Sequence, residues 1–387
     1  MRAGVMLGIP YQVQPAWLLI FAIAIVTFIS TLGGGATATL PPAFGLLVGG
    51  LVVALFVACI VAHELSHALV ARRLGLPLRT IQLLTLGRPV EAEPDPASPK
   101  SELLVSVAGP LLSASIAAAL LILASLIGTG RGEVVESLYR LCWWLGLSNL
   151  VLAGFHLVPV LPLDGGRIVQ AGAWAVVHDL DRATSVTGAV GRGFGYLVFG
   201  GGAYIIFVVD AFFGIWMVLL GWFATRLSRS SVDRRRLQQL TAGLHVRDAT
   251  DTVVTEIPAT MTVATLLEQD RQQGGSGAYP VIDGGLMTGI VFTARLGGPL
   301  RRSRPDRPVS EVAVPLDRAP TFGPDEPLIR AVERLETLRT DGFPVVDPDE
   351  PTRLYGVVTR ARVLERLRVR HRMTQARDGS ASLGERG

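Results

Sequence analysis

The stretch VACIVAHELSHALVARRLG (residues 57–75) places two histidines and a glutamate inside one of the most apolar regions of a 387-residue chain. Moving an ionisable side chain from water into hydrocarbon costs several kcal/mol unless the side chain finds a partner. One interpretation is a polar spot that lines a helix interface or lies at the membrane surface, because Arg72 and Arg73 follow closely. A bound metal ion that neutralises and orders these side chains explains the anomaly better.

The spacing within HELSH favours the metal. His63 and His67 are four residues apart, so on a helix they project from one face, one turn apart. Two imidazoles at this spacing can hold one Zn²⁺, and Glu64 can act as the general base toward an attacking water. The pattern therefore predicts a hydrolytic zinc site with an open coordination position and a third protein ligand elsewhere in the chain.

The composition indicates a membrane protein. Apolar residues make up 49% of the chain, charged residues only 18%, and the mean hydropathy is +0.43. The formal net charge is only +4, and the arginines gather at the ends of apolar segments and in the C-terminal half, which indicates membrane topology rather than nucleic-acid binding. Cys59 and Cys142, the two cysteines, each lie inside an apolar run, so we expect buried apolar residues rather than a disulfide framework.

Six apolar runs have the length of a membrane crossing, at about 16–32, 43–70, 102–127, 137–158, 190–208 and 211–227. The fifth is interrupted by Arg192 and by Gly200–Gly202. An even number of crossings puts both termini on one side. Arginines follow the second, fourth and sixth runs, at Arg72, Arg73, Arg79 and Arg88, at Arg167 and Arg182, and at Arg226, Arg229 and Arg234–Arg236. The opposite loops hold little beyond Arg131, so the positive-inside rule predicts cytoplasmic termini.

The composition changes after residue 230. Residues 231–243 read as a juxtamembrane linker, and residues 244–368 read as a soluble α/β region that contains an internal repeat. Each half begins with a short segment and a helix. The stretches YPVID and GIVFTARL (279–296) of the first half recur in the second half as FPVVD and GVVTRARV (343–363). Its two halves are about 244–300 and 307–368. Residues 369–387 are polar and small, and we expect a disordered tail.

Asp164 is the best candidate for the third metal ligand. It lies in FHLVPVLPLDGGR (155–167), where prolines break the fourth apolar run and two glycines allow a sharp turn. Non-helical backbone at membrane depth is tolerated where protein or a water-filled cavity surrounds it. The alternative is that Asp164 caps a helix that starts near Ile168. Glu102, which opens the third run, remains a second candidate ligand.

Three motifs, in order, resemble the site-2 protease family of intramembrane zinc metalloproteases: HELSH, AGPLLS (108–113) and LPLDGGR (161–167). The resemblance covers residues 8–227 and includes LGIPYQVQPAWLL (7–19). RPVEAEPDPASPKSE (88–102) matches the hairpin region that precedes the family's Gly-Pro motif. The resemblance implies that His63, His67 and Asp164 bind zinc and that Glu64 activates the water. The soluble repeat resembles a tandem pair of cystathionine-β-synthase (CBS) domains, which one subgroup of the family carries at its C-terminus.

The chain departs from the family pattern at His156, where the family usually has an asparagine eight residues before the zinc aspartate. An asparagine stands further upstream at Asn149, and either residue is a candidate oxyanion donor. Three roles of His156 compete: donor to the oxyanion, fourth zinc ligand, or buried histidine held by a backbone carbonyl. The hairpin region departs too, because Arg88 follows Gly87 where the family often has two glycines.

The CBS repeat departs from nucleotide-binding members at the ribose positions. Such members carry a Thr or Ser and, three residues later, an Asp for the ribose hydroxyls. Thr359 fits the first position of the second half, but Arg362 takes the place of the Asp, and Phe292 and Arg295 occupy the two places in the first half. We therefore expect weak or absent binding of adenosine nucleotides and, with arginine, a preference for phosphate-rich ligands.

The fold expected from the sequence is a multi-pass α-helical membrane protein, with about six transmembrane helices in residues 1–230, followed by a soluble α/β tandem CBS module. The function implied by the resemblance is intramembrane cleavage of single-pass membrane proteins such as anti-sigma factors, in regulated intramembrane proteolysis at the cell membrane. Expected partners are the lipid bilayer and a second copy through the CBS domains, and not nucleic acid. The alternatives are an inactive membrane scaffold and a CBS-regulated transporter, although residues 1–227 lack the repeated halves of many transporters.

Overall fold

The computed structural model describes residues 2–6, 9–12, 42–76, 96–129, 132–252, 255–272, 278–296, 306–316, 321–338, 342–350 and 353–370. It divides the chain into two compact units, Met1–Arg235 and Arg236–Gly387, called here the membrane unit and the CBS unit. Several features predicted from the sequence lie outside the described residues: the first crossing at 16–32, Arg79, the stretch from Gly87 to residue 95, Arg131 and the tail at 371–387.

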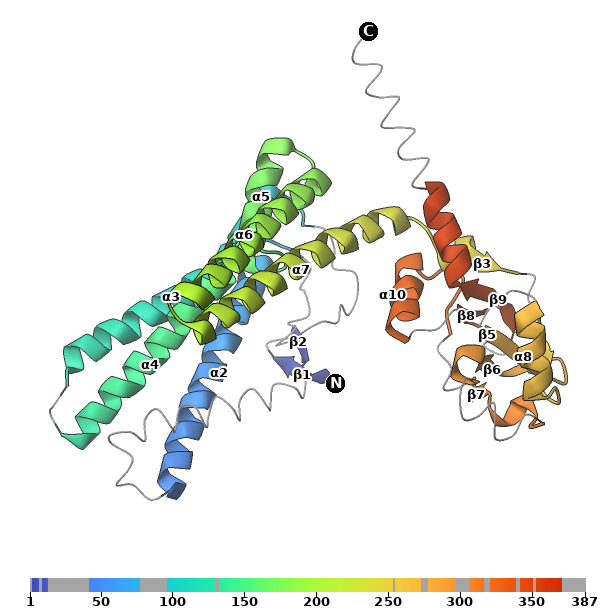
Figure 1. Ribbon diagram of the computed structural model, residues 1–387, viewed down its shortest axis with the longest axis horizontal. Coiled ribbons are helices and arrows are strands. Elements are labelled where there is room, and N and C mark those ends of the chain that lie inside the picture. Colours follow the sequence, from blue (N-terminus) through green and yellow to red (C-terminus); the bar gives the residue numbers. More distant parts are fainter. Residues whose placement is uncertain are drawn as a thin grey trace, which may run out of the picture. The chain divides into compact units, whose positions relative to one another are not determined.

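The described part of the membrane unit is helical apart from a short antiparallel hairpin of β1 (Arg2–Met6) and β2 (Ile9–Gln12) (Figure 1). Its helices are α2 (Pro42–Arg73), α3 (Pro99–Ile127), α4 (Glu133–His156), α5 (Asp164–Val177), α6 (Leu180–Val208) and α7 (Ala211–Thr241). Helix α3 packs against α2, α4 and α5, and α5 packs against α6. Helix α3 therefore has a central position in the unit, and it supports the residues of the candidate site.

Among the described residues, four helical segments are long and apolar enough to cross a membrane: Gly50–Arg73, Pro99–Ile127, Leu180–Val208 and Ala211–Thr241. They correspond to the predicted second, third, fifth and sixth crossings. Helix α4 covers the predicted crossing at 137–158 but is not among these four, and the count of six stays a prediction. The chain is thus a multi-helix membrane protein with a C-terminal α/β module.

The structure corrects two helix boundaries. Helix α6 begins at Leu180, earlier than the predicted residue 190, because the Asp179 side chain accepts hydrogen bonds from the backbone N–H groups of Asp181 and Arg182 at 2.8 Å each. It continues without interruption through Gly200–Gly202. Helix α7 runs on to Thr241, so most of the predicted linker at 231–243 is a helical continuation of the last crossing.

Burial in the membrane unit is inverted relative to a water-soluble protein. Large apolar side chains on the helices are exposed, with Phe207 at 88% and Leu197 at 73%. The buried positions hold mostly small or polar residues, among them Ala117, Ala183, Ser106, Ser113, Thr187 and Ser228. Lipid tails solvate large apolar side chains, and small residues let helix backbones approach closely. This burial pattern is therefore a second observation that fits a unit embedded in a lipid bilayer.

The CBS unit contains two sheets (Figure 1). One has the order β3 (Thr250–Asp251), β9 (Leu354–Thr359), β8 (Gly342–Val346), and the other has the order β4 (Ile257–Pro258), β5 (Ala278–Asp283), β6 (Leu286–Phe292), β7 (Val314–Pro315). The helices are α8 (Val263–Gln272), α10 (Leu328–Leu338) and residues 360–370, with short 3-10 turns at Val246–Ala249, Thr293–Leu296 and Val309–Glu311.

The predicted repeat is confirmed, and its two halves exchange strands. The hairpin β5–β6 of the first half and the hairpin β8–β9 of the second half fall on the two predicted pairs of strand segments. Strand β3, from the start of the first half, pairs with β9, and β7, from the start of the second half, pairs with β6. The two halves therefore share their sheets, and each of the two cores draws residues from both.

Candidate metal centre

Three side chains from two helices meet in the membrane unit. His63 and His67 project from α2, and Asp164 is the first residue of α5. One carboxylate oxygen, Asp164 Oδ2, lies 3.3 Å from the Nε2 atom of each histidine. The ligand atoms of the three residues all lie within 4.8 Å of one another, close enough to hold one metal ion. His63 and Asp164 are buried, and His67 is half-buried.

Helix α3 contacts both imidazoles at their Nδ1 atoms. His67 Nδ1 donates a hydrogen bond to the Val105 carbonyl at 2.6 Å, and His63 Nδ1 lies 2.9 Å from Ser113 Oγ. A backbone carbonyl can only accept, so the proton of neutral His67 sits on Nδ1 and its Nε2 lone pair faces Asp164. Partners of this kind orient metal-binding histidines and set their tautomer. The arrangement suits Nε2 coordination.

Gly109 makes room for both imidazoles. A Cβ atom at this position would lie 2.5 Å from His63 Nε2 and closer still to His67 Nε2. Val105, Gly109 and Ser113 are spaced by four residues and form one stripe of α3 that faces the histidines. In the AGPLLS motif, the spacing of Gly109 and Ser113 from Val105 is the sequence signal for their place beside the histidines.

A tight turn of the backbone positions Asp164 beside the histidines. A Cβ at Gly165 would overlap the Leu157 carbonyl, and one at Gly166 would overlap the backbone of Leu161, so only glycine fits at either position. The alternative reading of Asp164 as a helix cap is wrong. Helix α5 begins at Asp164 itself, rather than near Ile168, and its N-cap is Leu163, which makes no side-chain cap. The Asp164 side chain is thus directed to the histidines instead.

Glu102, the second candidate ligand, has a different partner. Its carboxylate forms an ion pair with Arg167 of the LPLDGGR motif at 2.8 Å, and it is 4% exposed. The pair joins the first turn of α3 to the first turn of α5. It therefore ties the helix that supports the histidines to the helix that carries Asp164.

The other candidate residues, His156, Glu64 and Asn149, differ in the contacts that they make. His156 Nδ1 lies 2.8 Å from Asp164 Oδ2, and its ring centroid lies 4.3 Å from that of His63. Glu64 follows His63 on α2, is half-buried, and forms no hydrogen bond or ion pair with a described residue. Asn149 is fully buried on α4; its amide N–H donates to the Leu145 carbonyl at 2.8 Å, and its Oδ1 has no partner among the described residues.

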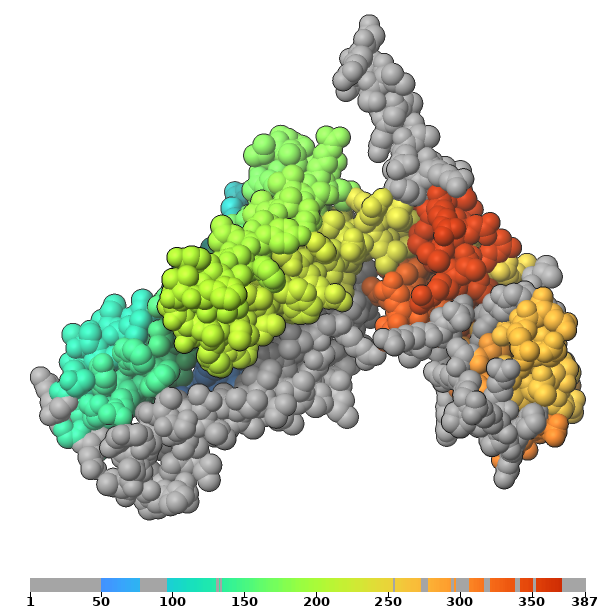
Figure 2. Space-filling model, viewed as in Figure 1, coloured from blue at the N-terminus to red at the C-terminus, as the bar shows by residue number. Residues whose placement is uncertain are grey.

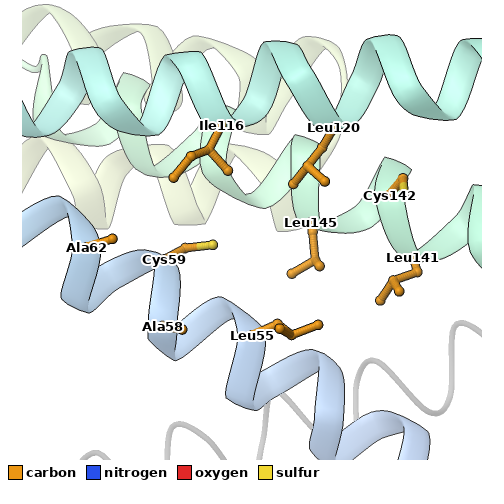
Figure 3. Close-up of a pocket in the computed structure, with 9 residues that line it drawn as sticks. All are labelled: Leu55, Ala58, Cys59, Ala62, Ile116, Leu120, Leu141, Cys142 and Leu145. Atoms are coloured by element: carbon orange, nitrogen blue, oxygen red, sulfur yellow. The ribbon is translucent and has the colours of Figure 1, made fainter.

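An apolar pocket of about 410 Å³ lies between α2, α3 and α4. In Figure 3 side chains from the three helices point toward one space: Leu55, Ala58, Cys59, Ala62, Ile116, Leu120, Leu141, Cys142 and Leu145. Ala62 immediately precedes His63, so the pocket adjoins the candidate site along α2. Both cysteines are free thiols that line it; Cys142 is buried, as expected, and Cys59 is half-buried.

In the CBS unit, Arg362 is held by carboxylates. Its Nε donates to Asp251 at 2.5 Å and its Nη1 to Glu365 at 3.0 Å, and these contacts raise the pKa of the guanidinium above its usual value. Asp251 comes from the first half of the repeat and Arg362 from the second. The residue at the expected ribose position thus links the two halves. The side chain of Arg295 lies outside the described ones.

Two histidines on a membrane-crossing helix and an aspartate at the start of α5 form a zinc-type ligand set, which is typical of a membrane-embedded metallopeptidase. The sequence profile of peptidase family M50 matches residues 51–137, which hold HELSH and AGPLLS, and that of the CBS domain matches residues 309–369. A relative in Mycobacterium tuberculosis is 30% identical over 93% of this chain and 91% of its own length. The chain belongs to peptidase family M50, the site-2 protease family, and is a zinc metallopeptidase.

The M. tuberculosis relative is named "Putative zinc metalloprotease Rip3". A Synechocystis relative, sll0528, bears the same description and is 29% identical over 68% of this chain and 67% of its own length. Among solved structures, that of CBSX2 in complex with AMP covers 32% of this chain and 95% of that chain, with 22% identity and a TM-score of 0.28.

Proposed function

We propose that this protein is an intramembrane-cleaving protease that hydrolyses peptide bonds within or next to the transmembrane segments of membrane-anchored proteins. The observation that supports this most directly is the meeting of His63, His67 and Asp164, with both histidines on a helix apolar enough to cross a membrane. A buried cluster of this kind is unfavourable in hydrocarbon without a function or a counter-ion.

The residues fit a single zinc ion. Two imidazole nitrogens and a carboxylate oxygen are ligands that catalytic zinc sites use, and three protein ligands leave one position open. The Nδ1 contacts of both histidines with α3 leave their Nε2 atoms for the metal. Zinc held here would supply Lewis-acid chemistry toward the scissile carbonyl and the attacking water.

Glu64 is proposed as the general base. It neighbours His63 on α2 and has no ion-pair partner among the described residues, so its carboxylate is available to accept a proton. It would take the proton from the attacking water and deliver it to the leaving amide nitrogen. Asn149 is the proposed contact for the substrate carbonyl, and His156, whose Nδ1 lies 2.8 Å from Asp164 Oδ2, is proposed to position that ligand.

The proposed substrates are single-pass membrane proteins, and anti-sigma factors are the class that the family resemblance suggests. A substrate helix would have to unwind locally, because helical hydrogen bonds occupy its peptide carbonyls. The apolar pocket beside His63 is suited to apolar side chains of such a segment. The paired CBS halves are proposed to support self-association. The inactive scaffold is less well supported, since a scaffold would not need Glu64 next to two metal ligands.

The deciding experiment measures zinc content and cleavage of a model transmembrane substrate by the purified full-length protein. Glu64→Gln should keep zinc but lower the cleavage rate by about 10²–10⁴-fold, because only the base is lost. His63→Ala and Asp164→Ala should each lose both zinc and activity. Stoichiometric zinc in a His63→Ala/His67→Ala double variant would contradict the ligand assignment, and normal cleavage by Glu64→Gln would contradict the mechanism.

The proposed location is the cell membrane, with both termini and the CBS unit in the cytoplasm, on the basis of arginine placement. A cysteine introduced at Gly132, between α3 and α4, should react with a membrane-impermeant thiol reagent added outside intact cells. One at Ser230, near the cationic end of α7, should react only after the cells are opened. The reverse pattern would overturn the orientation.

A further inference from the structure

A second pocket of the membrane unit, of about 520 Å³, lies between α6 and α7. These two helices are coloured from green to yellow in Figure 2. It is lined by two arginines, three aromatic rings, two hydroxyl side chains and one carboxylate: Arg226, Arg229, Tyr196, Phe199, Trp222, Thr225, Ser230 and Asp233. The three ligands of the candidate metal centre are absent from this lining, so its chemistry needs a separate explanation.

The two arginines of this pocket have no carboxylate partner among the residues that the structure describes. Some other arginines of the membrane unit do form ion pairs, as Arg167 does with Glu102 and Arg235 with Asp181. Arg226 instead stands 5.9 Å from the centre of the Trp222 ring, and Arg229 donates to the Tyr196 hydroxyl at 2.7 Å. Neither forms an ion pair within the described part of the chain. The pocket therefore presents two cations that are held in place but not neutralised.

The pocket lies where α7 changes from apolar to cationic. The apolar run ends at about residue 227, and arginines follow at 229 and 234–236. Aromatic side chains stand at its apolar end, with Trp222 at 53% and Tyr196 at 55% exposure. Tryptophan and tyrosine favour the level of lipid headgroups, and basic pockets between membrane helices bind anionic headgroups. The formal charge of the lining, two arginines and Asp233, is +1.

We propose that this pocket binds the phosphodiester headgroup of one anionic phospholipid. Arg226 and Arg229 donate to the phosphate oxygens, since guanidinium groups match phosphate geometry. Asp233, one turn beyond Arg229, accepts a hydrogen bond from a headgroup hydroxyl, such as that of glycerol. Trp222 and Phe199 contact the part of the acyl chains that lies next to the headgroup. The net charge of +1 balances a single phosphodiester.

The test is native mass spectrometry of the purified full-length protein, titrated with phosphatidylglycerol or with phosphatidylcholine. The wild type should bind one phosphatidylglycerol in preference to phosphatidylcholine, and each arginine replaced by glutamine should reduce that preference roughly fivefold, because one arginine near the membrane surface contributes about 1 kcal/mol. Arg234→Gln is the matched control: it removes the same charge from an exposed position of α7 outside the pocket, and should leave the preference unchanged.

Unchanged preference in an Arg226→Gln/Arg229→Gln double variant would overturn the proposal, and so would an equal loss in Arg234→Gln, which would indicate diffuse attraction only. Displacement of the lipid by millimolar inorganic phosphate would also overturn the proposal, because it would show that the site recognises free phosphate rather than a lipid. If the double variant fails to fold, Tyr196→Phe decides. It keeps the ring and removes the hydroxyl that holds Arg229, so a wild-type preference in that variant would also overturn the proposal.

Discussion

The two units of this chain bury opposite kinds of side chain. In the CBS unit the fully buried positions hold large apolar residues such as Tyr279, Phe322, Phe343 and Ile290. In the membrane unit the residues with almost no exposure include His63, Ser106, Ser113 and Asn149, while large apolar side chains face outward. Water drives apolar surface inward in the first unit. Lipid removes that driving force in the second, where polar contacts and close backbone approach hold the helices together.

The difference explains where function is located. Polar groups buried in a membrane unit are costly unless they are satisfied, so those that remain mark a site. His63, His67 and Asp164 bring their ligand atoms within 4.8 Å of one another, and His67 donates a hydrogen bond to the backbone of α3. The buried polar residue Thr359 of the CBS unit, by contrast, accepts a hydrogen bond from the Arg362 backbone at the start of the last helix. There, burial of polar groups serves local structure.

The largest predicted effect of a small change concerns Gly109. Gly109→Ala would place a methyl group against the Nε2 atoms of both histidines, and we expect zinc affinity to fall by more than about 100-fold, beyond the range for altered outer contacts of a metal site. The measurement is zinc content by elemental analysis together with chelator competition. Gly154→Ala on α4, where a Cβ would meet nothing within 4 Å, is the matched control and should retain zinc. Equal zinc in both variants would show that the histidines can move aside.

Much of the candidate site was predictable because its signals are local. The i, i+4 spacing of His63 and His67 needs only a helix, and the prolines and glycines around Asp164 predict a turn. The Glu102–Arg167 ion pair and the stripe Val105–Gly109–Ser113 were not predicted, because they depend on which face of α3 packs against α2 and α5. The start of α6 was also misplaced. Arg192 and Gly200–Gly202 suggested a break, whereas Gly202 allows close packing of α6 on α7, since a Cβ there would lie only 2.6 Å from Val218 N.

A second prediction tests the contrast in burial directly. Phe343 is fully buried between Phe292 and Phe322, so Phe343→Ala should lower the free energy of unfolding of the CBS unit by about 3–5 kcal/mol. Phe207 on α6 is 88% exposed, and Phe207→Ala should change stability by less than about 0.5 kcal/mol. Calorimetric unfolding of the full-length variants measures both. A large loss for Phe207→Ala would mean that this face packs against protein rather than lipid.

The predicted effect of changing His156, the clearest departure from the family, is smaller than that of changing Gly109. Its Nδ1 contacts Asp164 at 2.8 Å, so the partner is a carboxylate rather than the backbone carbonyl considered from the sequence. A neutral imidazole that donates from Nδ1 has no proton left on Nε2 and cannot donate to an oxyanion. Nor does His156 belong to the group of three ligand atoms within 4.8 Å of one another. We therefore expect His156 to position Asp164, in the manner of residues that orient metal ligands.

His156→Ala should then weaken zinc binding by roughly 10–100-fold, because Asp164 loses the contact that orients it. His156→Asn should retain most of the affinity, since an amide N–H can donate to the same carboxylate oxygen. Chelator competition measures the affinity, and cleavage of a model transmembrane substrate at saturating zinc measures turnover. Unchanged zinc affinity with a roughly 100-fold slower turnover in His156→Ala would instead support the oxyanion donor. Wild-type values for both quantities would leave His156 as a buried histidine without a part in the site.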